Sequence, residues 1–170
     1  MKSFLVIFLA AMSCLCSHVN AQNFFHYDNE AVDWTHWKAP ISVTFSRDLT
    51  WVLFGNERLE ISQCSSAKRF CLATEEFVFA LPNLKLAVGA KWRERRTTFE
   101  IIEKLEFSKL GVKFNAFRIR SSRSSGRAIE FVFSCERGIV AINDFALDFS
   151  SVEHYVLREA DGVGKGACTR

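Results

Sequence analysis

Apolar and polar residues alternate along most of this chain from Ile41 onward, and this alternation restricts the fold more than any other feature. Ile41, Val43 and Phe45 are separated by single serine or threonine residues, and the pattern returns at Ile129 and Phe131, on either side of Glu130. Successive side chains of a β-strand point to opposite faces, so a period of two predicts strands with one buried face. Short polar turns separate these runs, as expected for a chain built mainly of strands.

Most connections between the predicted strands are too short to hold a crossover helix, which favours antiparallel pairing of consecutive strands. The chain also has 17 Phe and 4 Trp but only 2 Pro, a composition suited to a thick β core. We therefore expect an all-β, mainly antiparallel fold. It would be a meander forming a β-barrel or β-sandwich of about 8 to 10 strands, with room for one short helix.

Two segments fit either a helix or a strand. In residues 97–111, Thr97 and Glu100 would form a helical capping box, whereas a strand requires a slip at Ile102. We favour the strand because β-branched and aromatic residues dominate the segment. For residues 152–159, the sequence leaves a final strand and a short helix open.

The first residues of the chain have the three-part layout of a secretory signal peptide. Lys2 precedes an apolar run from Phe4 to Met12, and small or polar residues follow as far as Ala21. The run is shorter than the roughly 20 residues of a membrane-spanning helix, and charged residues interrupt every later apolar stretch. We expect cleavage after Ala21, export to a secreted or periplasmic location, and no transmembrane segment in the mature chain. Acylation at Cys14, as in a lipoprotein, is the alternative.

The length of the chain fits one domain after the signal peptide. The stretch between 22 and 40 is aromatic and acidic without a sustained period, and Pro40 restricts the residue before it to extended conformations. We expect three segments: a cleaved signal peptide at 1–21, an irregular aromatic and acidic N-terminal arm at 22–40, and a single disulfide-stapled β domain at 41–170.

Four cysteines remain after the signal peptide is removed: Cys64, Cys71, Cys135 and Cys168. An even number in an exported chain predicts two disulfides, with three pairings to choose from. The short polar loop favours pairing Cys64 with Cys71, which leaves Cys135 for Cys168, although the other two pairings stay open. The spacing matches neither a zinc site nor a C-x-x-C redox motif, so we expect no metal.

The chain carries a net charge of +3, and loss of Lys2 with the signal peptide lowers it by one. Such a near balance does not favour electrostatic capture of nucleic acid or of an anionic membrane. We therefore expect a small ligand or a protein as the partner, no nucleic acid and no cofactor. The oligomeric state stays open.

Two clusters of basic residues lie on predicted strands and on the serine-rich loop at 121–127. Alternate residues of a strand share a face, so each cluster would project together and bind an anionic ligand or partner through guanidinium groups. The candidates are Lys91, Arg93, Arg95, Arg118, Arg120, Arg123 and Arg127. The alternative is an edge strand kept soluble by its charge.

The N-terminal arm contributes the remaining candidate contacts. Trp34 and Trp37 would stack on a sugar or pack against the domain, and packing is the commoner role of tryptophan. His26, His36 and the carboxylates between them match no metal-binding spacing, which favours a solvated acidic arm.

Catalytic motifs are missing from the sequence. It contains neither G-x-S-x-G nor H-E-x-x-H, and the candidate that remains is His154 beside Glu153 or Glu159. We therefore expect an exported, non-catalytic binding or interaction module. It would bind a small apolar ligand in an aromatic-lined core or an acidic partner on an arginine-rich face. The alternatives are a structural subunit of a cell-envelope or secretion assembly that docks through the arm, and a hydrolase with an unrecognised site.

Overall fold

The structure is a computed structural model of the chain. It describes residues 23–30, 42–62, 64, 70–75, 78–83, 85–123, 126, 128–145 and 152–168. The signal peptide predicted at 1–21 lies outside the described residues, so cleavage after Ala21 stays a prediction.

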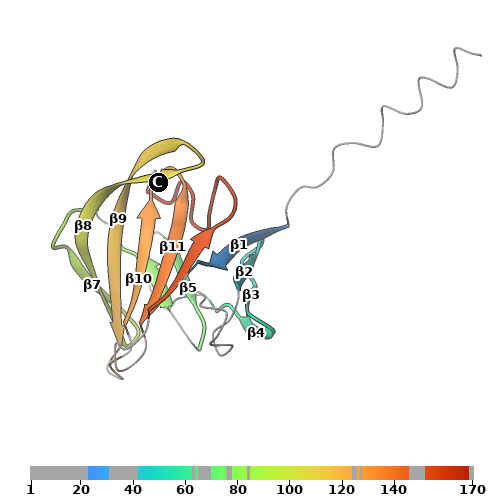
Figure 1. The fold of residues 1–170 in the computed structure, drawn as a ribbon. Helices are drawn as coiled ribbons and strands as arrows, with labels where there is room; N and C mark the ends of the chain where they lie inside the picture. The colour runs from blue at the N-terminus through green and yellow to red at the C-terminus, as the bar shows by residue number, and fades with distance from the viewer. Residues whose placement is uncertain are drawn as a thin grey trace, which may run out of the picture.

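The described residues form β-strands and turns, with no helix among them. One antiparallel sheet has the strand order β4-β3-β2-β1-β12-β11-β10-β9-β8-β7, and β5 and β6 form a separate hairpin (Figure 1). The strands are β1 (Phe24–Asn29), β2 (Ser42–Ser46), β3 (Trp51–Phe54), β4 (Glu57–Glu60), β5 (Phe70–Ala73), β6 (Val78–Leu81), β7 (Lys91–Glu94), β8 (Thr97–Lys109), β9 (Val112–Arg123), β10 (Ala128–Ser134), β11 (Gly138–Phe145) and β12 (Val152–Leu157).

This topology confirms the predicted all-β antiparallel meander. From β1 to β4 and from β7 to β12, consecutive strands pair with each other, and the first strand β1 pairs with the last strand β12. The sheet curves but stays open among the described residues, because β4 and β7 are its two edges. The hairpin of β5 and β6 packs against one face of the sheet as a second layer.

The segment that fitted either a helix or a strand is the long strand β8. It pairs with β9 along its whole length, and the register shifts between Ile101 and Glu103, where the strand interpretation required a slip. Phe99 and Ile101 lie before the bulge on the same face of the strand, and both are fully buried. The last ambiguous segment is also a strand, β12.

The prediction of an irregular arm at 22–40 is wrong for residues 24–29, which form β1 inside the sheet. Tyr27 pairs with Val43 of β2 on one side and with Leu157 of β12 on the other. Asp and Asn are poor strand formers, but two neighbouring strands and the burial of the Tyr27 ring override that weak local preference. Residues 31–40 lie outside the described part of the chain.

Two strand boundaries also differ from the sequence pattern. The apolar run from Leu84 to Trp92 predicts one strand, yet β7 begins only at Lys91, because a turn precedes it with Gly89 at a φ of 83°. Conversely, β5 begins at Phe70, inside the loop that the sequence predicts between Cys64 and Cys71. It pairs with β6 from Phe70 to Ala73.

The centre of the core is aromatic and lies between the hairpin and the long sheet. The Phe79 ring of β6 lies 4.8 Å from the Phe131 ring and 5.7 Å from the Phe133 ring, both on β10. All three side chains are fully buried. The Trp92 Nε1–H group donates a hydrogen bond of 2.9 Å to the carbonyl oxygen of Ala80, so the buried indole N–H has an acceptor.

Two disulfides cross-link the fold, one across the loop before β5 and one at the C-terminal tail. Cys64 bonds to Cys71, and Cys135 bonds to Cys168, which confirms the two predicted bridges and the favoured pairing. Disulfides of this kind are typical of chains that fold in an oxidising compartment, outside the cytosol. No helix in the described part of the chain has the length and apolar character needed to span a membrane.

Candidate functional site

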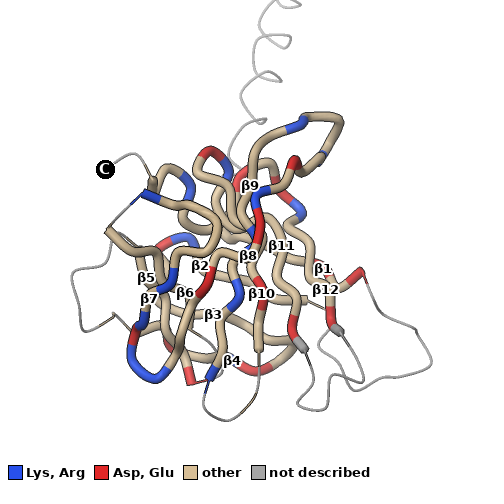
Figure 2. The backbone as a smooth tube through the Cα atoms, turned by 90° about the vertical axis from the view of Figure 1, so that its left-hand side faces the viewer, with Lys and Arg blue, Asp and Glu red and all other residues tan. Residues whose placement is uncertain are grey.

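The arginine-rich face predicted from the sequence carries alternating charges. Three of its cations lie opposite a glutamate of the neighbouring strand: Lys91 is 3.3 Å from Glu100, Arg118 is 3.0 Å from Glu103, and Arg120 is 2.6 Å from Glu130. Figure 2 likewise shows positions of both signs interspersed along the strands. Charges paired across strands neutralise one another, so this surface holds no concentrated positive field.

The other described members of the predicted basic set do not share a common partner. Arg95 donates to the Ser62 hydroxyl at 3.1 Å, and Arg123 donates to the carbonyl oxygen of Glu75 at 2.8 Å. Arg93 lies exposed on β7, and Arg127 is outside the described residues. The structure therefore offers weak support for this face as the main binding site.

A pocket of about 490 Å³ lies where the C-terminal tail, residues 161–168, crosses the ends of β1, β2 and β5; we call it the tail pocket. Phe25 and Phe70 supply aromatic walls, Arg47 and Leu49 come from the turn after β2, and six residues of the tail between 161 and 167 complete the lining. Its volume falls within the range of small-molecule binding sites. Comparisons with protein-family models, curated proteins and solved structures gave no match.

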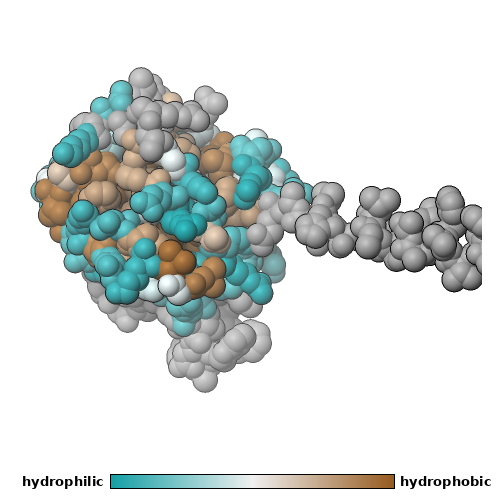
Figure 3. Space-filling view, turned by 90° about the horizontal axis from the view of Figure 1, so that it is seen from above, coloured by the Kyte–Doolittle hydropathy of each residue, from teal (hydrophilic) through white to brown (hydrophobic). Residues whose placement is uncertain are grey.

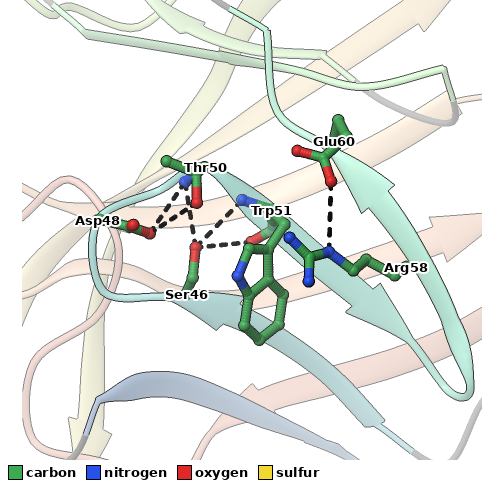
Figure 4. Close-up of polar contacts among 6 residues, drawn as sticks. All are labelled: Ser46, Asp48, Thr50, Trp51, Arg58 and Glu60. Carbon is green, nitrogen blue, oxygen red and sulfur yellow. Dashed lines mark hydrogen bonds and ion pairs between the residues drawn. The ribbon is translucent and has the colours of Figure 1, made fainter.

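The turn between β2 and β3 places Arg47 and Leu49 at the tail pocket, and Figure 4 shows the hydrogen bonds of Ser46, Asp48 and Thr50 that hold this turn. The Ser46 hydroxyl donates to the Trp51 carbonyl oxygen and accepts from the Thr50 and Trp51 N–H groups, each at 3.1 Å. Leu49 has a φ of 57°, a left-handed conformation that costs energy for a residue with a Cβ. The hydrogen bonds around it offset that cost and fix the turn.

Asp48, in the same turn, strengthens the network. Its carboxylate accepts from the Thr50 N–H at 3.2 Å and from the Thr50 hydroxyl at 2.9 Å. Hydrogen bonding from Ser46, followed by that from Thr50, lowers the pKa of the Asp48 carboxyl below its ordinary value. The turn therefore holds an ionised carboxylate next to the residues that line the pocket, and this carboxylate accepts hydrogen bonds from Thr50.

The tail is fixed by covalent and polar contacts. Cys168 ties it to the end of β10 through Cys135, and the Gly166 N–H donates to the Cys135 carbonyl oxygen at 3.0 Å. Asp161 is 2.5 Å from Lys165 and 3.1 Å from Arg137. The hydrogen bond from Lys165, with a further one from Arg137, lowers the pKa of the Asp161 carboxyl.

A buried hydroxyl joins the tail to β1. The Tyr27 hydroxyl donates to the Ile139 carbonyl oxygen at 2.9 Å and accepts from the Val163 N–H at 3.3 Å. Burial raises the pKa of Tyr27, so the phenol stays neutral and can donate. One side chain thus connects β1, β11 and the tail directly behind the tail pocket.

His26 makes contacts of a kind that nucleophilic catalysis uses. Its Nδ1 atom is 2.7 Å from the Thr44 hydroxyl oxygen, and its Nε2 atom is 2.9 Å from the Asp28 carboxylate. His26 alternates with Phe25 on β1, however, so this chain of groups lies on the face away from the tail pocket. In the described part of the chain, no three His, Cys, Asp or Glu residues are arranged to hold a metal ion.

His154, the catalytic candidate of the sequence, is half-buried on β12. Its Nδ1 atom contacts the Asn143 side-chain oxygen, whereas Glu153 accepts from the Tyr155 hydroxyl on the opposite face. Glu159 accepts from the His26 backbone N–H at 3.0 Å. The three predicted groups therefore do not converge, and their geometry gives no support to catalysis at His154.

Exposed apolar residues form no continuous surface on the face that Figure 3 shows, where they lie in patches between hydrophilic residues. The large exposed apolar side chains among the described residues are Phe24, Val88, Leu110 and Val112. The predicted aromatic contacts Trp34 and Trp37 lie outside the described residues and stay predictions.

Sequence reasoning missed the tail pocket because its walls are far apart along the chain. In the sequence, Phe25 falls in the predicted arm, Phe70 in the loop between Cys64 and Cys71, and Arg47 in a turn after the alternating run at 41–46. One signal was available, since glycines at 162, 164 and 166 beside a cysteine predict a tail that lies close to other backbone. A Cβ at Gly164 would lie only 3.1 Å from the Phe70 ring.

Proposed function

We propose that the protein is an exported, non-catalytic binding module that takes a small, largely apolar ligand in the tail pocket. One observation carries the proposal: the ends of β1, β2 and β5 and a disulfide-fixed tail line a half-open, ligand-sized pocket with two aromatic side chains in its walls. The core aromatics Phe79, Phe131 and Phe133 pack on one another, which favours a site beside the core over one inside it.

Export agrees with this proposal on two grounds. The predicted signal peptide would carry the chain out of the cytosol, and the oxidising compartment beyond it would form the disulfide that fixes the tail. A pocket that is fixed before the ligand arrives loses less conformational entropy on binding.

Native mass spectrometry of the protein purified from its own compartment tests this proposal. A bound small molecule should appear with the wild-type chain and be reduced in Gly164→Ala, because the added methyl group meets the Phe70 ring in the pocket wall. Gly89→Ala is the matched control. Gly89 also has a positive φ, of 83° against 79°, but a Cβ there meets no atom within 4 Å. Equal ligand occupancy in the two variants would place the ligand elsewhere.

A further inference from the structure

Arg47 is the cation of the tail pocket whose charge is not balanced. Its guanidinium carbon lies 4.8 Å from the centre of the Phe25 ring, and no carboxylate pairs with it in the described part of the chain. Arg58 shows the contrast: it lies 5.0 Å from the Trp51 ring centre but also pairs with Glu60 at 3.3 Å. Stacking leaves the N–H groups at the edge of a guanidinium available for a planar anion.

The residues that line the pocket carry a net positive charge; Asp48 is not among them, and its carboxylate accepts from Thr50. Besides Arg47, the ionisable residues of the lining are Lys165 and Asp161, which form an ion pair with each other at 2.5 Å. Asp161 also accepts a hydrogen bond from Arg137 at 3.1 Å, so its carboxylate pairs with two basic side chains, those of Lys165 and Arg137. One positive charge of the lining is therefore left over, and it belongs to Arg47.

The remaining walls are suited to an apolar group. Phe70 comes from β5 and Leu49 from the turn after β2, and both side chains line the pocket. Gly164 has no side chain to fill the space in front of the Phe70 ring. A ligand reaching from Arg47 to Phe70 would thus meet a cation at one end and hydrocarbon at the other.

We propose that the tail pocket binds a small organic acid, with its anionic group on the Arg47 guanidinium and its apolar body against Phe70 and Leu49. This inference rests on the proposed function, because it names the ligand class of the same site. The anionic group is a carboxylate or a phosphate, since both match the guanidinium edge through two parallel hydrogen bonds.

Three probes separate the two halves of the ligand: naphthyl phosphate, naphthol and inorganic phosphate, each titrated calorimetrically into the oxidised mature protein. Naphthyl phosphate should bind about tenfold more tightly than either fragment, because only this probe meets both ends of the pocket. Arg47→Gln should weaken naphthyl phosphate about tenfold and leave naphthol unchanged. Arg93→Gln, which removes an exposed arginine from β7, should change neither affinity. Added salt should weaken naphthyl phosphate more than naphthol.

The outcomes distinguish this inference from the proposed function. If naphthol binds as tightly as its phosphate and Gly164→Ala weakens both, the pocket is a ligand site but the acid specificity is wrong. If Arg47→Gln and Arg93→Gln weaken naphthyl phosphate equally, the effect is one of net charge and the assignment to Arg47 fails. If none of the probes binds, the acid inference fails, whereas a ligand bound to the purified protein would still support the proposed function.

Discussion

Replacing Tyr27 with Phe removes one oxygen atom from behind the tail pocket and should cost the fold about 2 kcal/mol. The hydroxyl makes two buried hydrogen bonds, at 2.9 Å to the Ile139 carbonyl oxygen and at 3.3 Å from the Val163 N–H. A typical hydrogen bond contributes about 1 kcal/mol net, and leaving a buried donor without a partner adds the cost of its desolvation. The hydrogen bond from the Val163 N–H is long, so we expect its loss to add little beyond the total of about 2 kcal/mol.

Equilibrium unfolding in urea, followed by tryptophan fluorescence under oxidising conditions, measures this loss. Tyr155→Phe is the matched control, because Tyr155 is also buried but its hydroxyl donates to the half-exposed Glu153, which water can solvate in its place. We expect Tyr155→Phe to lose about 1 kcal/mol or less. Equal losses in the two variants, or unchanged hydrogen exchange at the Val163 N–H in Tyr27→Phe, would refute the reasoning.

Three further substitutions test other parts of the fold. Leu110→Asn should stabilise the protein by about 0.5 to 1 kcal/mol, raising the thermal midpoint, because Leu110 is 74% exposed with a φ of 50° in a tight hairpin turn; a lower midpoint would contradict this. Phe79→Ala should lose about 3 to 5 kcal/mol in urea unfolding, against less than about 1 kcal/mol for the exposed Phe24→Ala. The folded state lowers the pKa of Asp161, so its stabilising contribution is present above the ordinary pKa of 3.8 and lost as the pH falls through the lowered value. The stability difference between the wild type and Asp161→Asn should therefore vanish in acid, and a constant difference would exclude this linkage.

The sequence predicted the fold class because the period of two is a local signal that burial then selects. Val43 and Phe45 are fully buried and alternate with residues of the opposite face, as the pattern requires. The sequence also predicted the slip at Ile102, because a bulge changes the alternation of apolar residues within the strand itself. The prediction of an irregular arm was wrong for residues 24–29 because β2 and β12 stabilise this strand by pairing with it on both sides. The local sequence of residues 24–29 does not show this pairing.

The candidate site was not predictable for a related reason. Basic residues at alternate positions indicate a cationic face only if the neighbouring strands carry no acidic residues opposite them. The register of β8, β9 and β10 sets Glu100 opposite Arg120 and Arg120 opposite Glu130. Register is a property of pairing, so the neutralisation of this face emerges only when the strands are placed side by side.

The tail pocket also depends on the order in which the chain is completed. Its Phe25 wall lies on β1, the first strand of the sheet, and its floor belongs to the tail that follows β12. Pairing of β1 with β12 joins these ends, and the Cys135–Cys168 bond locks the tail over them. A partly synthesised chain lacks one of these two ends, and a reduced chain lacks the bond that ties the tail to the end of β10. We therefore expect the proposed ligand to bind the completed, oxidised chain and to stabilise the contacts of β1 and the tail that form its site.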